Sequence, residues 1–422
     1  MTTAGKGNLP VEYTSLAGRA EEIAEGLLGL SESRLVTVTG PGGVGKSRVA
    51  TRVAHGARRR FPDGVWYAEL SHVADERSLV AAVAATMGRA ELTTAEEVAD
   101  AFAGWRALLV LDTCEHLMGP VSRLVEAVLR GTGRTKVLAV SRVLLTVPGQ
   151  RVLTVGPLPE HEALALFVER ARAVDQGFEL TEATRPFAEE ICRSLEGVPL
   201  AIELAAGCLR SLPLSELLER MDDRWPDLAG SSTNVLARQR DLRSLVEWSH
   251  ALCGTEQRVL WEALSVLSGS FPLEVAEAAG AAAGLPEADV AAVLCDLVDH
   301  SVVLREPTAD GMRYRLLGLY RRVGLARLDG RQRGPLDRTP PPPPPPPPRT
   351  PPAPRAAPLS PREAQVATLI AEGLTNLQIA NRLVISKRTV DAHVRNILAK
   401  SNLASRTHVA AWVTTEDTSV RL

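Results

Sequence analysis

An unbroken run of prolines, Pro340 to Pro348, divides this chain into two parts that must fold separately. Proline has no backbone N–H and a fixed φ, so the run can form neither the interior of a helix nor a central strand. We predict a stiff polyproline II spacer within a linker over residues 331–358. Such a run is also a ligand for SH3-type domains, but a linker between two folded parts requires no further partner.

The composition is that of an ordinary folded protein. The chain has 422 residues, 45% of them hydrophobic, and a net charge of -2, so we expect about three domains and only a local basic surface. The odd number of cysteines, with no C-x-x-C pair, argues against a disulfide framework or a zinc site. The first ten residues lack the apolar core of a signal peptide, and no apolar run reaches the ~20 residues of a membrane span. The expected location is the cytoplasm.

The N-terminal half alternates short apolar runs with segments of helix length, which is typical of a doubly wound parallel sheet. The predicted strands are 34–39, 65–70, 107–111, 136–140 and 152–155. From residue 160 to about 330 the pattern is mostly helical, with helices predicted at 161–173, 184–196, 201–209, 239–252 and 255–267 and one short strand at 313–317.

Residues 40–47, G-P-G-G-V-G-K-S, match the phosphate-binding loop G-x-x-x-x-G-K-[ST]. The loop follows a predicted strand and precedes a predicted helix at 47–58, which is the context that the motif requires. Glycines let backbone N–H groups turn toward phosphate oxygens, and the helix N-terminus adds partial positive charge. We expect Lys46 to reach the β- and γ-phosphates of a nucleotide and the Ser47 hydroxyl to bind Mg²⁺.

A second motif supports the first. Residues 107–112, A-L-L-V-L-D, form an apolar strand that ends in an acid, as a Walker B strand does. A buried strand of this kind delivers Asp112 to the phosphate site, where it holds Mg²⁺ through water. An acid at a strand end alone is common, but here it accompanies a phosphate-binding loop.

Around these motifs the chain resembles the STAND signal-transduction ATPases, which share the NB-ARC-like nucleotide-binding module, over roughly residues 12–328. The stretches that carry the resemblance are D-T-C-E-H-L at 112–117, L-A-G-R-A-E-E at 16–22, V-S-R at 140–142, E-G-V-P-L-A-I-E-L-A-A at 196–206, L-R-S-L-V-E-W-S at 242–249 and R-Y-R-L-L at 313–317. The last two are similar to the family's winged-helix region.

The resemblance implies a nucleotide site for ATP or ADP. In the family, the residues that match Gly18 and Arg19 contact the base and ribose, the arginine at Arg142 faces the γ-phosphate, and the proline at Pro199 lies against adenine. The full predicted set for the nucleotide is Gly18, Arg19, Gly40, Gly42, Gly43, Val44, Gly45, Lys46, Ser47, Arg48, Asp112, Arg142 and Pro199, with Ser47 and Asp112 for Mg²⁺.

Two positions depart from the family pattern. Thr113 stands where relatives with fast turnover carry a second acid. Glu115 is the nearest other carboxylate and is a weak candidate for a catalytic base, so we expect at most a slow ATPase that acts as a switch. Gly318 replaces the glutamate of the family's R-Y-R-L-L-E, which predicts the loss of a side-chain contact between the winged helix and the nucleotide site.

The segment after the prolines is locally basic. Residues 359–413 hold seven lysines and arginines against three acids, a local charge of +4 in a chain of net charge -2. Capping signals predict four short helices: a capping box at Ser360–Glu363 with a stop at Gly373, a second box at Thr375–Gln378, and caps at Ser386 and Ser405. Two short helices with a tight turn, the second of them longer and basic, are typical of a helix-turn-helix.

The third predicted helix has two faces. Val390, Val394, Ile397 and Leu398 have the spacing of a core stripe, whereas Thr389, His393, Asn396 and Lys400 form a polar stripe with Arg388 and Arg395 beside it. A recognition helix presents such a stripe to the major groove, where cations bind phosphates and an arginine or Asn396 reads base edges. A solvated face of a small helical bundle is the alternative.

This segment resembles the LuxR-type DNA-binding domain over about residues 359–413. The matching stretches are L-S-P-R-E at 359–363, G-L-T-N at 373–376, Q-I-A at 378–380 and S-K-R-T-V-D-A-H-V at 386–394, with Ser401 in place of the usual leucine. In the family, the residues that match Thr389, His393 and Lys400 hold phosphate, and the residue at Val390 touches bases. The predicted DNA-binding set is Thr375, Lys387, Arg388, Thr389, Val390, His393, Arg395, Asn396 and Lys400.

These features together predict a multidomain protein. The expected parts are an α/β P-loop domain at 1–157, a helical subdomain at 158–235, a winged-helix subdomain at 236–330, the linker, an all-α four-helix LuxR-type domain at 359–415 and a tail at 416–422. The expected function is an ATP-binding, nucleotide-switched transcription regulator that binds double-stranded DNA, acts as a homo-oligomer and contacts RNA polymerase.

Two other functions stay open. One is a P-loop enzyme of the kinase type, against which the missing base and the helix-turn-helix count. The other is a constitutive DNA binder with a structural nucleotide. The family's helical-repeat sensor has no counterpart here, since only the proline-rich stretch stands in its place.

Overall fold

The computed structural model of the chain describes residues 7–12, 14–224, 242–332, 360–371 and 376–383, and the positions 389, 390, 393, 394, 397 and 400. The chain divides into two compact units, Met1–Thr339 and Pro340–Leu422. We describe each unit by itself. The predicted spacer and its proline run lie outside the described residues.

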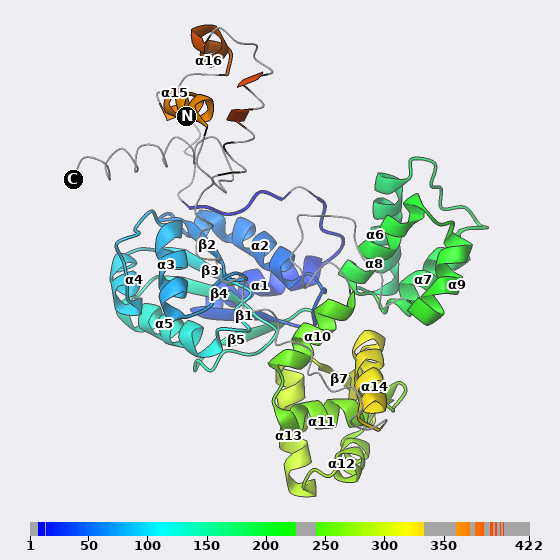
Figure 1. Ribbon diagram of the computed structural model, residues 1–422. Coiled ribbons are helices and arrows are strands. Elements are labelled where there is room, and N and C mark those ends of the chain that lie inside the picture. The colour runs from blue at the N-terminus through cyan, green and yellow to red at the C-terminus, as the bar shows by residue number, and fades with distance from the viewer. Residues whose placement is uncertain are drawn as a thin grey trace. The chain divides into compact units, whose positions relative to one another are not determined.

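The N-terminal part of the first unit contains a five-stranded parallel sheet (Figure 1). Its strands are β1 (Leu35–Thr39), β2 (Val65–Glu69), β3 (Leu108–Asp112), β4 (Lys136–Val140) and β5 (Arg151–Thr154). Their order is β2-β3-β4-β1-β5, and every neighbouring pair is parallel. The prediction of a doubly wound sheet is confirmed, and each strand lies within one residue of the range expected from the sequence.

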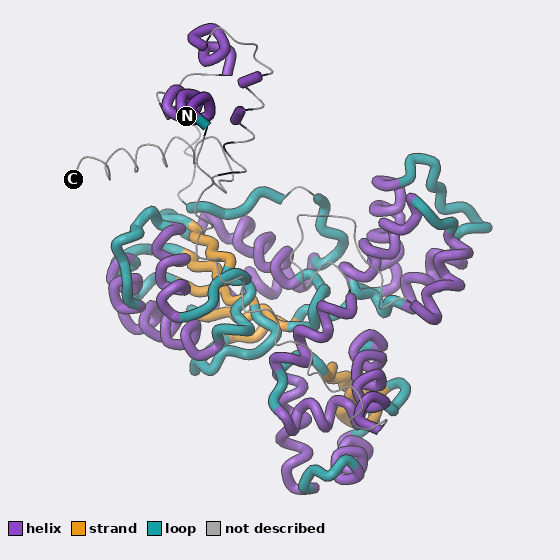
Figure 2. The backbone as a smooth tube through the Cα atoms, in the orientation of Figure 1, coloured by secondary structure: helices purple, strands orange, loops and turns teal. Residues whose placement is uncertain are grey.

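Helices cover both faces of this sheet (Figure 2). They are α1 (Ala20–Glu32), α2 (Lys46–Ala57) with the short 3-10 turn η1 (Arg58–Arg60), α3 (Glu76–Thr86), α4 (Ala95–Ala101) and α5 (Met118–Gly131). Residues of the sheet enter two separate cores: Val36 and Val38 pack with α2, whereas Leu109 and Val137 pack with α3 and α5. Strands buried on both faces are continuously apolar, which is why these runs could be recognised in the sequence.

Helices continue the chain beyond the sheet. They are α6 (Glu160–Val174), α7 (Arg185–Ser194), α8 (Pro199–Gly207) with the 3-10 turn η2 (Cys208–Arg210), and α9 (Leu214–Arg224). Pro199 is the first residue of α8, a position where the missing N–H costs nothing because the first N–H groups of a helix have no partner within it. The helix predicted at 201–209 therefore begins two residues earlier.

The remainder of the first unit holds α10 (Leu242–Leu252), α11 (Thr255–Leu264), β6 (Ser270–Phe271), α12 (Leu273–Ala282), α13 (Glu287–Asp299), β7 (Val303–Thr308), β8 (Gly311–Leu316) and α14 (Gly318–Gln332). The strand predicted at 313–317 is confirmed as β8, but it belongs to an antiparallel sheet of order β6-β8-β7. Its partner β7 was missed because V-L-R-E-P-T has only two apolar residues in succession and a proline. One buried core joins this region to the preceding helices, with Phe167, Ile191 and Trp261 among its members.

In the second unit, α15 (Pro361–Ala371) and α16 (Asn376–Leu383) have the bounds that the capping signals predict for the first two helices. The Ser360 hydroxyl accepts from the Glu363 N–H at 3.2 Å, and the Glu363 carboxylate accepts from the Ser360 N–H at 2.8 Å, so the predicted capping box is confirmed. The caps proposed at Gly373, Thr375, Ser386 and Ser405 lie outside the described residues. In the described part of the chain, no helix has the length and apolar character needed to cross a membrane.

Candidate nucleotide and DNA-binding sites

The phosphate-binding loop joins the carboxyl end of β1 to the start of α2, as the motif requires. Gly40, Gly43 and Gly45 have φ values of 144°, 81° and 94°, a region that side chains rarely adopt. A Cβ at Gly40 would also lie 2.1 Å from the Val155 carbonyl oxygen. The Lys46 Nζ donates to the carbonyls of Gly40 and Pro41, at 2.8 Å each. The glycine-rich loop therefore has a defined conformation, and its own carbonyl groups hold the Lys46 ammonium.

Asp112 ends β3 beside this loop. One carboxylate oxygen accepts from the Ser47 hydroxyl at 2.8 Å and the other from the Tyr67 hydroxyl at 2.5 Å. Burial raises the pKa of the Asp112 carboxyl, and burial together with Asp112 raises the pKa of Tyr67. A desolvated carboxylate next to a hydroxyl oxygen is the donor set that Mg²⁺ prefers, so Ser47 and Asp112 fit the ion. Sequence reasoning missed Tyr67, which lies on the adjacent strand β2.

Arg142 follows β4 and is buried. Its guanidinium donates to the Leu245 carbonyl at 3.0 Å and to the Ser249 hydroxyl at 2.6 Å, both on α10. It also forms an ion pair with Glu115 at 3.4 Å. The arginine predicted to face the γ-phosphate and the weak candidate for a base are thus engaged with each other and with the winged-helix region.

The winged-helix region contacts the phosphate-binding loop directly. The Tyr320 hydroxyl, on α14, accepts from the backbone N–H of Gly42 at 2.8 Å, although the two residues are 278 positions apart. A Cβ at Gly42 would lie 2.9 Å from Arg142 and 3.0 Å from Leu245. The Ser301 hydroxyl lies 3.1 Å from that of Thr39, next to the loop. No sequence signal had marked Tyr320 or Ser301 for the site.

The helical subdomain also reaches this loop. The N–H of Leu200, next to Pro199, donates to the Gly43 carbonyl at 3.1 Å. Glu196 lies three residues before Pro199. Its carboxylate accepts from the Gly318 N–H and from the Arg315 guanidinium, the latter at 2.8 Å. The backbone at Gly318 therefore has a carboxylate contact with Glu196. Position 318 itself supplies no side chain, so the expected loss of a side-chain contact between the winged helix and the nucleotide site stays a prediction.

The segment before α1 lies against the same loop. Gly18 and Arg19 have φ values of 63° and 70°. The buried Arg19 side chain donates to the carbonyls of Val44, at 3.0 Å, and of Gly156, at 2.7 Å. Arg48 donates to the Thr14 carbonyl at 2.9 Å. These two arginines connect the N-terminal segment to the phosphate-binding loop and its helix.

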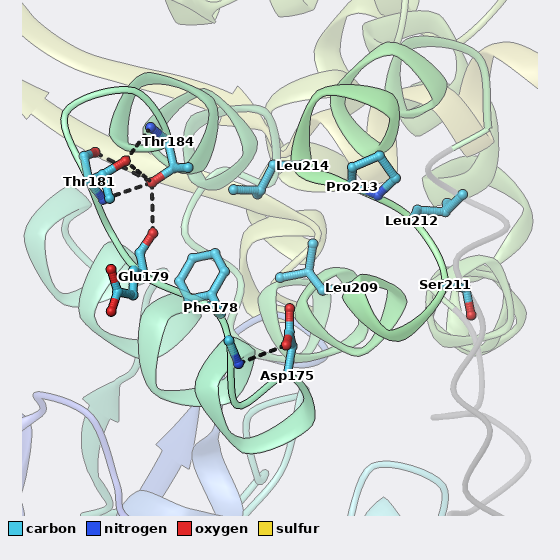
Figure 3. Close-up of a pocket in the computed structure, with 11 residues that line it drawn as sticks. Asp175, Phe178, Glu179, Thr181, Thr184, Leu209, Ser211, Leu212, Pro213 and Leu214 are labelled. Carbon is cyan, nitrogen blue, oxygen red and sulfur yellow. Dashed lines mark hydrogen bonds between the residues drawn. The ribbon is translucent and has the colours of Figure 1, made fainter.

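A separate pocket of about 510 Å³ lies in the helical subdomain (Figure 3). It is formed by the segment between α6 and α7 and by the turn before α9, with Phe178 and Leu209 inside and a hydrogen-bonded Thr181–Thr184 pair at its edge. None of the predicted nucleotide or DNA residues lines it.

In the second unit, the described positions of the third predicted helix are helical. Thr389 is exposed and His393 is half-buried, but Val390 has no exposed surface and packs with Val366 and Ile379. The apolar spacing predicted this core position, and it leaves Val390 no surface for the base contact that the resemblance implies. The predicted residues Thr375, Lys387, Arg388, Arg395 and Asn396 lie outside the described residues.

Lys400, predicted to hold phosphate, forms an ion pair with the buried Glu363 at 2.6 Å. The hydrogen bond from Lys400, followed by that from the Ser360 N–H, lowers the pKa of Glu363 to about 2. Lys400 therefore connects its helix to the start of α15 and has a structural role besides any contact with DNA.

This ion pair predicts a pH dependence. Because the pKa of Glu363 is depressed, its stabilising effect is complete above the ordinary glutamate pKa of about 4.3 and is lost as the pH falls toward about 2. We expect the protection of α15 amides, relative to the unstructured exchange rate at each pH, to fall across that interval. In Glu363→Gln, protection should be lower at neutral pH and should change less on acidification; an unaltered acid response in this variant would contradict the assignment.

The fold and the sites define a P-loop ATPase-like protein with a separate helix-turn-helix unit. The second unit matches the family of bacterial regulatory proteins, luxR family, over residues 357–413. Uncharacterized protein Rv0894 of Mycobacterium tuberculosis is 35% identical over 320 residues, 75% of this chain and 81% of that protein. Rv0890c of the same species, named as an HTH-type transcriptional regulator, is 34% identical over 71% of this chain but 34% of its own length.

Among solved structures, the Walker-type ATPase PABY2304 of Pyrococcus abyssi shares the fold, with a TM-score of 0.52 and 13% identity over 73% of this chain and 96% of that chain. The chain belongs to the same family as Rv0894. It combines a P-loop ATPase-like domain with a C-terminal LuxR-type helix-turn-helix domain, the two parts of a transcription regulator.

Proposed function

We propose that the first unit binds ATP with Mg²⁺ and that the bound nucleotide controls how the second unit binds promoter DNA. The observation that carries the proposal is the hydrogen bond between the Gly42 N–H and the Tyr320 hydroxyl. A backbone donor of the phosphate-binding loop is held by a side chain of the winged helix, so occupation of the loop and the position of the winged helix depend on one another.

The residues of the site have distinct proposed roles. Backbone N–H groups of Gly43, Val44 and Gly45 hold phosphate oxygens, and Lys46 supplies the main positive charge. Ser47 and Asp112 hold Mg²⁺, which neutralises phosphate charge when it is bound. The base and ribose of the nucleotide are proposed to lie near four residues: Gly18, Arg19, Arg48 and Pro199. Hydrogen bonds connect the segments that carry these residues to the phosphate-binding loop and its helix.

The coupling follows from donors that the winged-helix region already occupies in this arrangement. Arg142 donates to Leu245 and Ser249 of α10 in this arrangement, and Gly42 donates to Tyr320. When Arg142 and Gly42 turn to a nucleotide that carries a γ-phosphate, α10 and α14 lose these partners. We propose that the released winged helix allows first units to assemble, which brings two DNA-binding units to paired half-sites. The same assembly would present a surface to RNA polymerase.

The test compares full-length protein with a fragment that starts at Leu359, on single and paired half-sites selected from random duplexes. ATP should tighten binding of the full-length protein to paired sites and should leave the fragment unaffected, because two linked modules gain from effective concentration. A large ATP effect on a monomer bound to a single half-site would contradict this mechanism. An unchanged oligomeric state with ATP would favour the constitutive binder.

Hydrolysis should be slow, which separates a switch from a kinase-type enzyme. Thr113 provides no second acid after Asp112, and Glu115 is held by Arg142. We expect phosphate release far below the ~10 s⁻¹ that is typical of enzymes. A phosphate-release assay on the purified protein that found rapid multiple turnover without a partner would rule out this prediction.

A further inference from the structure

Cations gather at the edge of the parallel sheet that lies away from the phosphate-binding loop. Arg34 precedes β1, Arg106 lies two residues before β3, Lys136 begins β4, Arg134 precedes it, and Arg58–Arg60 end the helix that follows the loop. Parallel strands begin at a common edge, and Lys136 donates its backbone N–H to the Ala107 carbonyl at 3.0 Å. We call these residues the amino-edge surface.

Side-chain contacts show that Lys136, Arg60 and Arg34 of this surface lie close together. The Lys136 ammonium donates to the Leu30 carbonyl, and the Arg60 guanidinium donates to the Leu27 carbonyl. Both cations therefore lie against the last turns of α1. Arg34 donates to the Thr135 carbonyl at 3.2 Å, directly before β4. The pKa of Lys136 is lowered by burial and then by the neighbouring charges of Arg34, Arg60 and Arg106, which is the effect of crowding like charges.

Three arginines of this surface form no ion pair with another described residue. Arg59, Arg106 and Arg134 are exposed, and among the described residues their side chains form no hydrogen bond or ion pair. Two carboxylates at this edge have other partners. Asp63 accepts from the backbone N–H of Arg106 at 2.9 Å, and Glu32 forms an ion pair with Arg151.

Elsewhere on the unit, exposed arginines commonly pair with glutamates. Arg123 pairs with Glu76 and Arg130 with Glu126, at 2.7 and 2.8 Å. Exposed cations that repel one another and lack such partners destabilise a free surface, whereas an external polyanion would stabilise them.

We propose that the amino-edge surface binds the phosphate backbone of DNA that flanks the site held by the helix-turn-helix unit. The two units share one chain, so DNA bound by the second unit is present near the first at high effective concentration. The surface lies at the opposite end of β1 from Gly40, so it leaves the nucleotide site accessible. Backbone contacts of this kind add affinity without sequence preference. The inference depends on DNA binding by this chain and is independent of the nucleotide switch.

The experiment measures how binding of the full-length protein to DNA depends on salt, without nucleotide. The probe is a fluorescent duplex of random sequence, longer than one LuxR-type site, followed by anisotropy over a range of NaCl concentrations. Each phosphate contact contributes about 0.9 to the slope of log K against log salt. The triple variant Arg59→Ala/Arg106→Ala/Arg134→Ala should lower that slope by about two to three units.

A matched control removes the same charge elsewhere on the first unit, with Arg77→Ala/Arg172→Ala/Arg185→Ala, all exposed. The control should keep nearly the full slope. An unchanged slope in the amino-edge variant overturns the proposal, and so does an equal loss in both variants, since net charge alone would then explain it. If the triple variant unfolds, Arg59→Glu alone decides the question, with a loss of about one unit or more expected.

Discussion

Lys46→Ala should lose ATP binding by about 100-fold or more, which corresponds to ~2.7 kcal/mol. The Lys46 ammonium is held by the carbonyls of Gly40 and Pro41 at 2.8 Å each, so it is fixed where phosphates would approach the loop. Alanine removes this charge, and the backbone donors of the loop alone must then balance the phosphates. The loop is partly buried, where the missing charge is poorly replaced by water.

Isothermal titration with Mg-ATP measures the effect, and thermal unfolding shows whether the variant keeps its fold. Lys136→Ala is the matched control, because it removes the same side chain from the opposite edge of the same sheet. The control should bind ATP as the parent does. If Lys46→Ala bound ATP with the affinity of the parent, the assignment of Lys46 to the phosphates of the nucleotide would be wrong.

The local parts of this site were predictable from the sequence. The strand, the glycine-rich turn and the helix that follows lie in one short stretch, and Asp112 ends an apolar run that only a buried strand explains. The second unit was predictable for the same reason, since the capping box at Ser360 fixes the start of α15 within four residues. Both inferences rest on interactions between near neighbours in the chain.

The contacts that close the site were not predictable in this way. Tyr320 lies on α14, and nothing in its local pattern distinguishes it from a core aromatic residue, which it also is. Tyr67 reaches Asp112 because β2 and β3 are neighbours in the sheet, and strand order is a tertiary property. The carboxylate of Glu196 accepts from the Gly318 N–H across 122 residues of chain, a contact that inspection of position 318 alone could not reveal.

Tyr320→Phe should raise the affinity for ATP by about tenfold. The change removes only the hydroxyl that accepts from the Gly42 N–H. The ring would remain stacked on Trp261, whose centroid lies 5.5 Å away, and Trp261 would still donate to the Tyr320 backbone carbonyl at 3.0 Å. The fold of the winged helix should therefore persist.

The gain in affinity comes from the nucleotide-free state. Without the hydroxyl, the Gly42 N–H is left unsatisfied in a buried place, which costs about 1–3 kcal/mol. The nucleotide-bound state does not carry this cost under the proposed mechanism, because there Gly42 donates to phosphate. Every 1.4 kcal/mol added to the free state strengthens binding about tenfold.

Tyr314→Phe is the control for this prediction. Tyr314 lies on β8 of the same region and stacks on Phe271 at 6.4 Å, and none of its described contacts involves the phosphate-binding loop. It should leave ATP affinity unchanged, while Tyr320→Phe should also accelerate amide hydrogen exchange in α14. If Tyr320→Phe bound ATP no more tightly than the parent, the Tyr320 hydroxyl would be a packing feature only. The coupling of the winged helix to the nucleotide would then have to run through Arg142 alone.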